Sequence, residues 1–66
     1  MDITLNGKPL QIDQVSTIAD LIAHLGYQDK RIAVEQNGEI IPKSTHSTAP
    51  VSNGDHLEIV VAVGGG

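Results

Sequence analysis

The most apolar stretch of this 66-residue chain is residues 57–63, Leu-Glu-Ile-Val-Val-Ala-Val, which is followed by three glycines. A nearly continuous run rich in β-branched residues is typical of a central strand. Such a strand is covered on both faces, or by a helix on one face and a partner protein on the other. A domain of this size buries only about 60% of its unfolded surface. The chain therefore has room for one small core, built around this strand.

Two Asn-Gly pairs, at residues 6–7 and 37–38, predict two β-hairpins. Short segments of alternating apolar and polar residues flank these pairs: residues 3–5, 10–12, 32–35 and 39–41. Asn-Gly favours the type I′ turn, in which both central residues have positive φ. Pro9 has no backbone N–H, so the second strand is predicted to lie at a sheet edge.

Residues 17–25 carry the pattern of a short helix. One apolar face is formed by residues at helical spacing: Ile18, Leu21, Ile22 and Leu25. Thr17 is predicted to be the N-cap, with Asp20 near the positive end of the helix dipole. Gly26 is placed to end the helix. A helix of about three turns is marginal alone, so packing on the sheet must stabilise it.

The predicted order is strand, strand, helix, strand, strand, strand, and residues 43–50 are predicted to be a loop with one short helical turn. One helix packed across one mixed sheet is the simplest arrangement for these elements. The prediction is an α+β fold of the β-grasp, ubiquitin-like kind, with the last strand beside the first in the middle of the sheet. Residues 1–63 form the domain, and residues 64–66 form a flexible glycine tail.

Composition narrows the possible functions. The chain has no cysteine, which excludes disulfides, cysteine zinc ligands and a cysteine nucleophile. Its formal charge is -4, so nucleic-acid binding is not expected. No apolar run predicts a membrane span or a signal peptide, and a cytoplasmic location is expected.

The three histidines, His24, His46 and His56, lack the short spacings of metal sites and are predicted to lie at the surface. The hydroxyl residues around His46 are interpreted as a polar loop and not as a nucleophile site. No catalytic residue and no metal ligand is predicted, and the chain is not expected to be an enzyme.

The order of several motifs resembles that of the ubiquitin-like sulfur carriers, and most closely the ThiS family of thiamine thiazole synthesis. The resemblance covers the whole chain. It rests on Asn53-Gly54-Asp55, the apolar strand after it, the terminal glycine pair, Asn6-Gly7, the helix at 17–25 and the segment Val-Glu-Gln-Asn-Gly-Glu-Ile-Ile-Pro at 34–42.

This resemblance implies that the reacting residue is Gly66, with Gly65 completing the terminal pair and Gly64 as an additional glycine. A ThiF-like, E1-like enzyme would adenylate Gly66 with ATP, and sulfur from a donor protein would then give a thiocarboxylate. A ThiG-like thiazole synthase would receive the sulfur. The carrier itself would bind no cofactor, because ATP is used by the activating partner.

The last strand also suggests a docking surface. If Leu57, Ile59 and Val61 face the helix, then Val60 and Ala62 face the side that a single helix leaves open. Exposed apolar residues next to the tail suggest a partner-docking patch of Val60 and Ala62, with Ile41 as a possible addition.

Three other functions remain open from the sequence. A carrier for molybdopterin synthesis shares the tail and the fold. A ubiquitin-like protein modifier would instead join Gly66 to a lysine. A plain interaction module would use the sheet and leave the tail idle.

Overall fold

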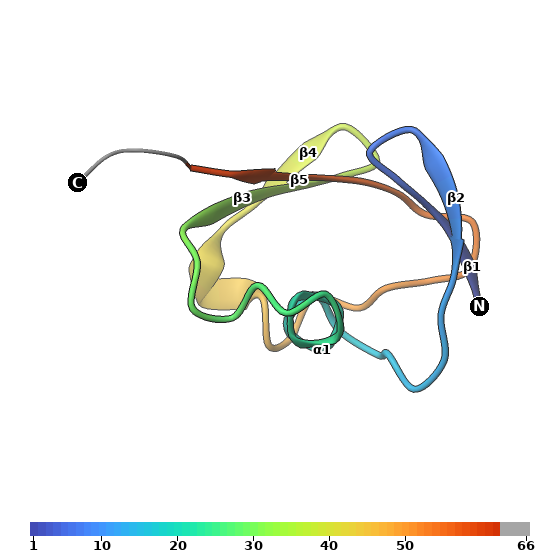
Figure 1. The fold of residues 1–66 in the computed structure, drawn as a ribbon, viewed down its shortest axis with the longest axis horizontal. Helices are drawn as coiled ribbons and strands as arrows, with labels where there is room; N and C mark the ends of the chain where they lie inside the picture. The colour runs from blue at the N-terminus through green and yellow to red at the C-terminus, as the bar shows by residue number, and fades with distance from the viewer. Residues whose placement is uncertain (63–66) are drawn as a thin grey trace.

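The computed structural model describes residues 1–62, and the predicted tail, Gly64, Gly65 and Gly66, lies outside them together with Val63. Five strands form one sheet, and a single α-helix crosses one of its faces (Figure 1). The elements in chain order are β1 (Asp2–Leu5), β2 (Lys8–Gln11), α1 (Ile18–His24), β3 (Ile32–Gln36), β4 (Glu39–Ile41), the short 3-10 helix η1 (Lys43–Thr45) and β5 (His56–Val61). The predicted α+β, β-grasp arrangement is confirmed.

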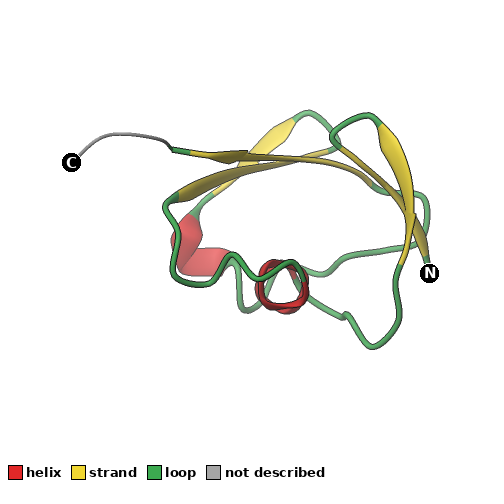
Figure 2. Cartoon of the chain, in the orientation of Figure 1, coloured by secondary structure: helices red, strands yellow, loops and turns green. Residues whose placement is uncertain are grey.

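The strand order in the sheet is β2-β1-β5-β3-β4. β5 therefore lies in the middle, parallel to β1 and antiparallel to β3. The helix and η1 lie on one side of the sheet, and the other side is free of helices (Figure 2). This confirms the prediction that the last and most apolar strand is central, beside the first.

The two predicted hairpins are present, and their turns have the expected geometry. Asn6 and Gly7 have φ of 51° and 80°, and Asn37 and Gly38 have φ of 51° and 88°. Both central residues are therefore in the left-handed region that Asn-Gly tolerates best. β2 carries Pro9 and is an edge strand, as predicted.

Helix α1 lies within the predicted range 17–25 and has the predicted N-cap, although its seven residues make it shorter than the predicted three turns. The Thr17 side chain accepts a hydrogen bond from the Asp20 N–H, and the Asp20 carboxylate accepts from the Thr17 N–H, which makes a capping box. Hydrogen bonds from the backbone N–H groups of Ser16 and then Thr17 lower the pKa of Asp20. At the other end, Gly26 has φ of 78° and follows the C-cap Leu25.

The core lies between the helix and the covered face of the sheet. Its most completely buried side chains come from α1, β3 and β5: Ile18, Leu21, Val34 and Leu57. Because α1 has only seven residues, this packing is what stabilises it. Within residues 1–62, no helix has both the length and the hydropathy of a membrane span.

The predicted surface position of His46 is wrong, whereas His24 and His56 are exposed as predicted. The side chain of His46 is only 8% exposed, and its Nε2 lies 3.1 Å from the carbonyl oxygen of Ile41. The carbonyl of His46 accepts a hydrogen bond of 2.8 Å from the N–H of Ala19. His46 therefore joins the end of β4 to the first turn of α1, a link between distant segments that a loop sequence without periodicity does not reveal.

Candidate functional site

The strand that leads to the glycine tail is firmly held up to the last described residue. The Ala62 N–H donates a hydrogen bond of 2.9 Å to the Arg31 carbonyl, one residue beyond the end of β5. Further back, the Asn6 side chain bonds both backbone groups of Ile59, accepting from its N–H at 2.8 Å and donating to its carbonyl at 3.2 Å. The side chain of Asn6, the residue after β1, thus extends the hydrogen bonding between β1 and β5. β5 is therefore held in place as far as Ala62.

β5 alternates between a buried face and an open face. Leu57 and Ile59 are 1% and 5% exposed and point toward the helix, whereas Val60 is 62% exposed. Ala62 is also exposed. The positions predicted for Val60 and Ala62 on the helix-free side are confirmed, and their use in docking stays a prediction.

The predicted position of Ile41 on this open face is wrong. Ile41 pairs with Val34, which also pairs with Ile59, and paired residues share a face of the sheet. Ile41 is accordingly half-buried and packs against the core. Its neighbour Ile40 faces outward instead and is 69% exposed. The two-residue Asn37-Gly38 turn fixes this register, so counting back from it would have identified Ile40.

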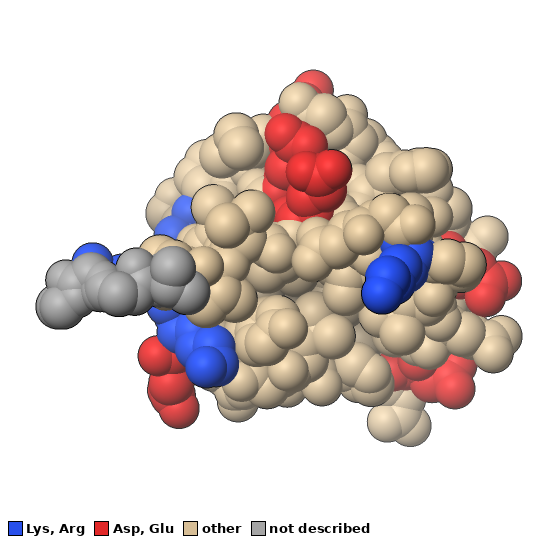
Figure 3. Space-filling view, turned by 45° about the horizontal axis from the view of Figure 1, so that its top comes forward, with Lys and Arg blue, Asp and Glu red and all other residues tan. Residues whose placement is uncertain are grey.

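We define the open-face patch as the exposed apolar residues on the helix-free side: Ala33, Ile40, Val60 and Ala62. Ala33 pairs directly with Val60, and Ile40 pairs with Glu35 on the next strand. Figure 3 turns this side of the molecule toward the viewer and shows a cluster of acidic side chains beside a broad uncharged surface, with basic side chains toward both ends. The patch is continuous with the part of β5 that precedes the tail.

Two carboxylates are paired directly across the open face, Glu35 on β3 and Glu58 on β5. Like charges at directly opposed positions of a sheet destabilise it. A basic group placed beside these two carboxylates would relieve the repulsion.

The Asn-Gly-Asp motif at residues 53–55 has a structural role. The Asp55 carboxylate accepts hydrogen bonds from the Ser52 N–H at 2.8 Å, from the Gln36 side chain at 2.9 Å and from the Asn37 side chain at 3.1 Å. Partial burial raises the pKa of Asp55, and these hydrogen bonds outweigh it, so that the pKa is lowered overall. Asp55 thereby fixes the start of β5 to the turn between β3 and β4.

Asn53 and Gly54 hold the other side of the same strand. The Asn53 side chain accepts a hydrogen bond of 2.7 Å from the Asp2 N–H, and the Gly54 N–H donates one of 2.6 Å to the Asp2 carbonyl. Gly54 has φ of 88°, which a side chain would strain. The motif that contributed to the family resemblance therefore positions β5. Across the described part of the chain, no three His, Cys, Asp or Glu residues are grouped to hold a metal ion.

Comparison with known proteins decides the family. A family model described as the ThiS family matches residues 3–66, nearly the whole sequence. The chain belongs to the ThiS family. The relationship includes the sulfur carrier protein ThiS of Bacillus subtilis, to which the chain is 38% identical over 97% of its own length and 98% of that protein.

A solved relative shows the same fold. The crystal structure of the thiamine biosynthesis protein ThiS from Geobacter metallireducens superimposes with a TM-score of 0.83, at 32% identity, and the match covers all of both chains. This agreement extends the ThiS assignment from sequence to three-dimensional structure.

Other relatives are much longer proteins. The chain is 39% identical to a thiazole synthase of Paramagnetospirillum magneticum and 32% identical to one of Magnetococcus marinus. Each match covers the whole chain but only 20% of that protein. The chain thus spans about a fifth of the length of these two relatives.

Proposed function

We propose that this ThiS-family protein carries sulfur as a thiocarboxylate on Gly66 and donates it for thiazole formation in thiamine biosynthesis. The observation that carries the proposal is the ThiS match over residues 3–66, which includes the terminal glycines. The B. subtilis relative is a sulfur carrier of nearly the same length, and the G. metallireducens relative is a thiamine biosynthesis protein.

The proposed chemistry needs an activating partner, because a carboxylate is a poor electrophile. In the first step, a carboxylate oxygen of Gly66 attacks the α-phosphorus of ATP, and pyrophosphate leaves. Hydrosulfide supplied by the donor then attacks the acyl carbon, forms the C–S bond and displaces AMP, which is a good leaving group. The net change on the carrier is one oxygen replaced by sulfur. The carrier supplies the acyl group, and the ThiF-like partner supplies ATP and the catalytic residues.

The glycine residues suit this role for a steric reason. Glycine has no Cβ, so a Gly-Gly end can enter a narrow channel and adopt backbone angles closed to other residues. Three residues, Gly64 to Gly66, span at most roughly 10 Å when extended. The hydrogen bonds of Asn6, Asp55 and Ala62 hold the preceding strand while the tail reaches into a partner's active site.

The open-face patch is proposed to dock the partner enzymes. It presents Ile40 and Val60, the large apolar side chains with the greatest exposure among residues 1–62, on the side of the sheet that α1 does not cover. The facing pair Glu35 and Glu58 favours a partner surface with basic residues around an apolar centre. The longer thiazole synthase relatives support a ThiG-like partner, because a ThiS-like segment makes up a fifth of each of them.

The molybdopterin carrier and the protein modifier remain alternatives, since each can begin from the same acyl-adenylate. The relatives favour the thiazole pathway over both, because they include thiazole synthases and a thiamine biosynthesis protein. We expect a thiazole synthase to accept the thiocarboxylate, which would distinguish this protein from a molybdopterin carrier. We expect no adduct between Gly66 and a lysine, which would distinguish it from a protein modifier.

Intact-mass analysis tests the proposed chemistry. The protein is incubated with ATP, a ThiF-like enzyme and a sulfur donor, and the expected product has gained the mass of sulfur minus oxygen, located at Gly66 by fragmentation. A variant that lacks Gly65 and Gly66 is the control and should not change. The proposal would be disproved if the wild-type mass stays unchanged while the same ThiF-like enzyme modifies another ThiS protein.

A further inference from the structure

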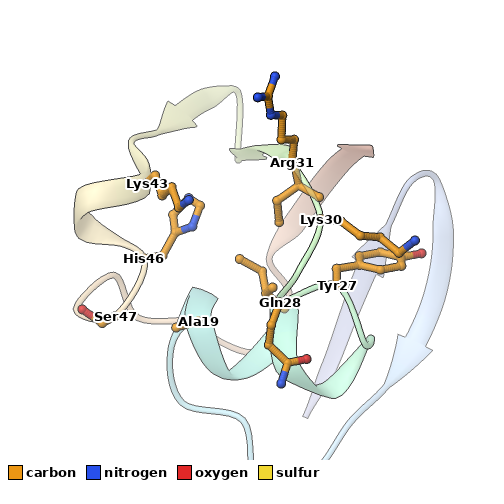
Figure 4. A pocket seen from close by; sticks show the side chains of 10 residues that line it. Ala19, Tyr27, Gln28, Lys30, Arg31, Lys43, His46 and Ser47 are labelled. Atoms are coloured by element: carbon orange, nitrogen blue, oxygen red, sulfur yellow. The ribbon is translucent and has the colours of Figure 1, made fainter. Parts of the chain in front are cut away.

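The open face carries opposite charges at the two ends of one stretch of β3 and β5. Its positions along β3 recur at every second residue: Arg31 just before the strand, then Ala33 and Glu35. The hydrogen bond from the Ala62 N–H to the Arg31 carbonyl continues the ladder between β3 and β5 by one pair. Figure 4 accordingly shows the Arg31 side chain pointing out of the pocket beside α1 and away from that helix. A cation therefore lies at the end of the open face where β5 leaves the sheet.

Two carboxylates lie at the other end of the same stretch. Glu35 and Glu58 are paired directly, and the central pair of the stretch, Ala33 and Val60, lies between them and Arg31. Arg31 and Glu35 are each two residues from Ala33, a distance of about 6–7 Å along a strand. Along the strands, the open face thus presents a cation, a small apolar centre and two anions.

These carboxylates are not engaged within the described part of the chain. The side-chain carboxylates that accept hydrogen bonds among residues 1–62 are those of Asp20 and Asp55. Glu58 is exposed, and Glu35 is partly exposed on the same face. Both are therefore available to a cation from outside the molecule, which would relieve their mutual repulsion.

The order of charges is self-complementary. If a second copy stacks its open face on the first, a two-fold axis along the central pair reverses the direction of its strands. Each Arg31 then lies over the Glu35 of the other copy. Glu58 and Ile40 flank that glutamate, because both pair with it or stand beside it in the sheet. The guanidinium can bond both carboxylates, and the aliphatic part of the arginine can pack on Ile40.

We propose that the open face binds the open face of a second copy of this chain, in a symmetric dimer with antiparallel strands. A pair of carboxylates alone would fit any basic surface. The arginine on the same face, as far from the central pair as the carboxylates are, is what selects a second copy. The small central side chains, alanine and valine, suit the usual spacing of about 10 Å between packed sheets.

The dimer is weak, because the open-face patch is small and two of its four residues are alanine. Interfaces below the standard size associate weakly, and a Kd of about 0.1–1 mM is expected. The dimer covers the face that is proposed to dock partner enzymes, so dimer and enzyme complex would exclude each other. That consequence rests on the proposed function, whereas the dimer itself does not.

Sedimentation equilibrium of the wild type tests for the dimer. At low ionic strength, the average mass should approach twice that of the monomer as the concentration rises to about 2 mM. About 0.5 M NaCl should weaken the association several-fold, because it screens exposed ion pairs. Amide signals of Ala33 and Val60 should shift with concentration, and that of Ser47, on the helix side, should not. A wild type that stays monomeric, or shifts centred on the helix side, would overturn the proposal and leave the open face to other partners.

Complementary charge reversals test the arrangement. Arg31→Glu leaves acidic residues at both ends of the stretch, and the double variant Glu35→Lys with Glu58→Lys leaves basic residues at both ends. Each should weaken self-association at least about tenfold, because like charges then face each other. Mixed in equal amounts, the two variants place opposite charges at both contacts. They should form a heterodimer with a Kd within about threefold of the wild-type value.

Lys30→Glu is the matched control. It makes the same charge change as Arg31→Glu at the neighbouring exposed residue, whose side chain points in another direction (Figure 4). It should alter self-association less than about threefold and should not form the heterodimer with the double variant. Amide spectra confirm that each variant is folded. A mixture of the two folded reversal variants that fails to associate, or equal association of Lys30→Glu with the double variant, would refute the arrangement. The experiment uses no partner enzyme, so its outcome is independent of sulfur transfer.

Discussion

The two faces of the sheet differ in burial although they are formed by the same strands. On the covered face, the β5 residues Leu57 and Ile59 are 1% and 5% exposed. Val60, the residue after Ile59, points to the open face and is 62% exposed. The covered face holds the domain together, and the open face leaves apolar area available for a partner. The residues that stabilise the core and those proposed to dock a partner thus alternate along one strand.

The largest expected contrast is between Leu57 and Val60. Leu57→Ala should lower the free energy of unfolding by about 2–5 kcal/mol, because it leaves a cavity in a fully packed core. Val60→Ala on the same strand should change it by less than about 0.5 kcal/mol. Urea denaturation of both variants measures this difference. Similar losses in the two would contradict the assignment of separate roles to the faces.

The covered side also depends on a polar contact at its edge. His46→Leu should cost about 1–2 kcal/mol of stability, because a hydrogen bond to the Ile41 carbonyl is lost in a largely buried setting. His46→Gln retains an N–H donor and should lose less. His24→Leu, at an exposed position, is the control and should be nearly neutral. If His46→Leu proves as stable as the wild type, the contact does not stabilise the fold.

On the open face, a charge should impair function without impairing the fold. Val60→Glu adds a third carboxylate beside Glu35 and Glu58 and should slow thiocarboxylate formation about tenfold, while stability changes by less than about 0.5 kcal/mol. Gln11→Glu is the matched control, because it adds the same charge on the open side of edge strand β2. Initial rates with a ThiF-like enzyme give the comparison. Equal rates for both variants would exclude docking at Val60.

The smallest effect concerns Asp55, which fixes the start of the shared strand β5. Because the folded-state pKa of Asp55 is lowered, its contribution to stability is fully present above the unfolded aspartate pKa of about 4. That contribution is lost as pH falls through the lower folded value. Asp20 contributes with the same sign.

Asp55→Asn should therefore cost about 1 kcal/mol at pH 7 and flatten the acid decline in stability. Asp20→Asn should remove a further part of that decline. Urea midpoints measured from neutral pH to below pH 4 test both variants. An acid decline in Asp55→Asn as steep as that of the wild type would contradict the role given to this carboxylate.

Much of the fold could be predicted from local patterns, because the physics behind them is local. The Asn37-Gly38 turn requires positive φ, Thr17 and Gly26 delimit α1, and the alternation after Leu57 separates the faces. The alternation along β5 predicts the exposure of Val60. The exposure of Ile40 in place of Ile41 depends instead on the register that the Asn37-Gly38 turn sets between β3 and β4.

Features made by long-range contact were not predictable in the same way. His46 lies in a loop without periodicity, and its burial depends on Ala19 and Ile41, which belong to other segments. Lys30 and Lys43, which lie before β3 and after β4, line one pocket. The sequence contains these residues, and only the folded chain brings them together.

Transfer of sulfur tests the central claim most directly. The protein is loaded with ³⁵S as its thiocarboxylate, freed of donor and ATP, and mixed with a thiazole synthase and its other substrates in a single turnover. The account predicts that label moves from this protein into the thiazole, and that a control lacking Gly65 and Gly66 can be neither loaded nor used. Thiazole that forms without label, while the loaded protein retains its ³⁵S, would contradict a role as the sulfur carrier.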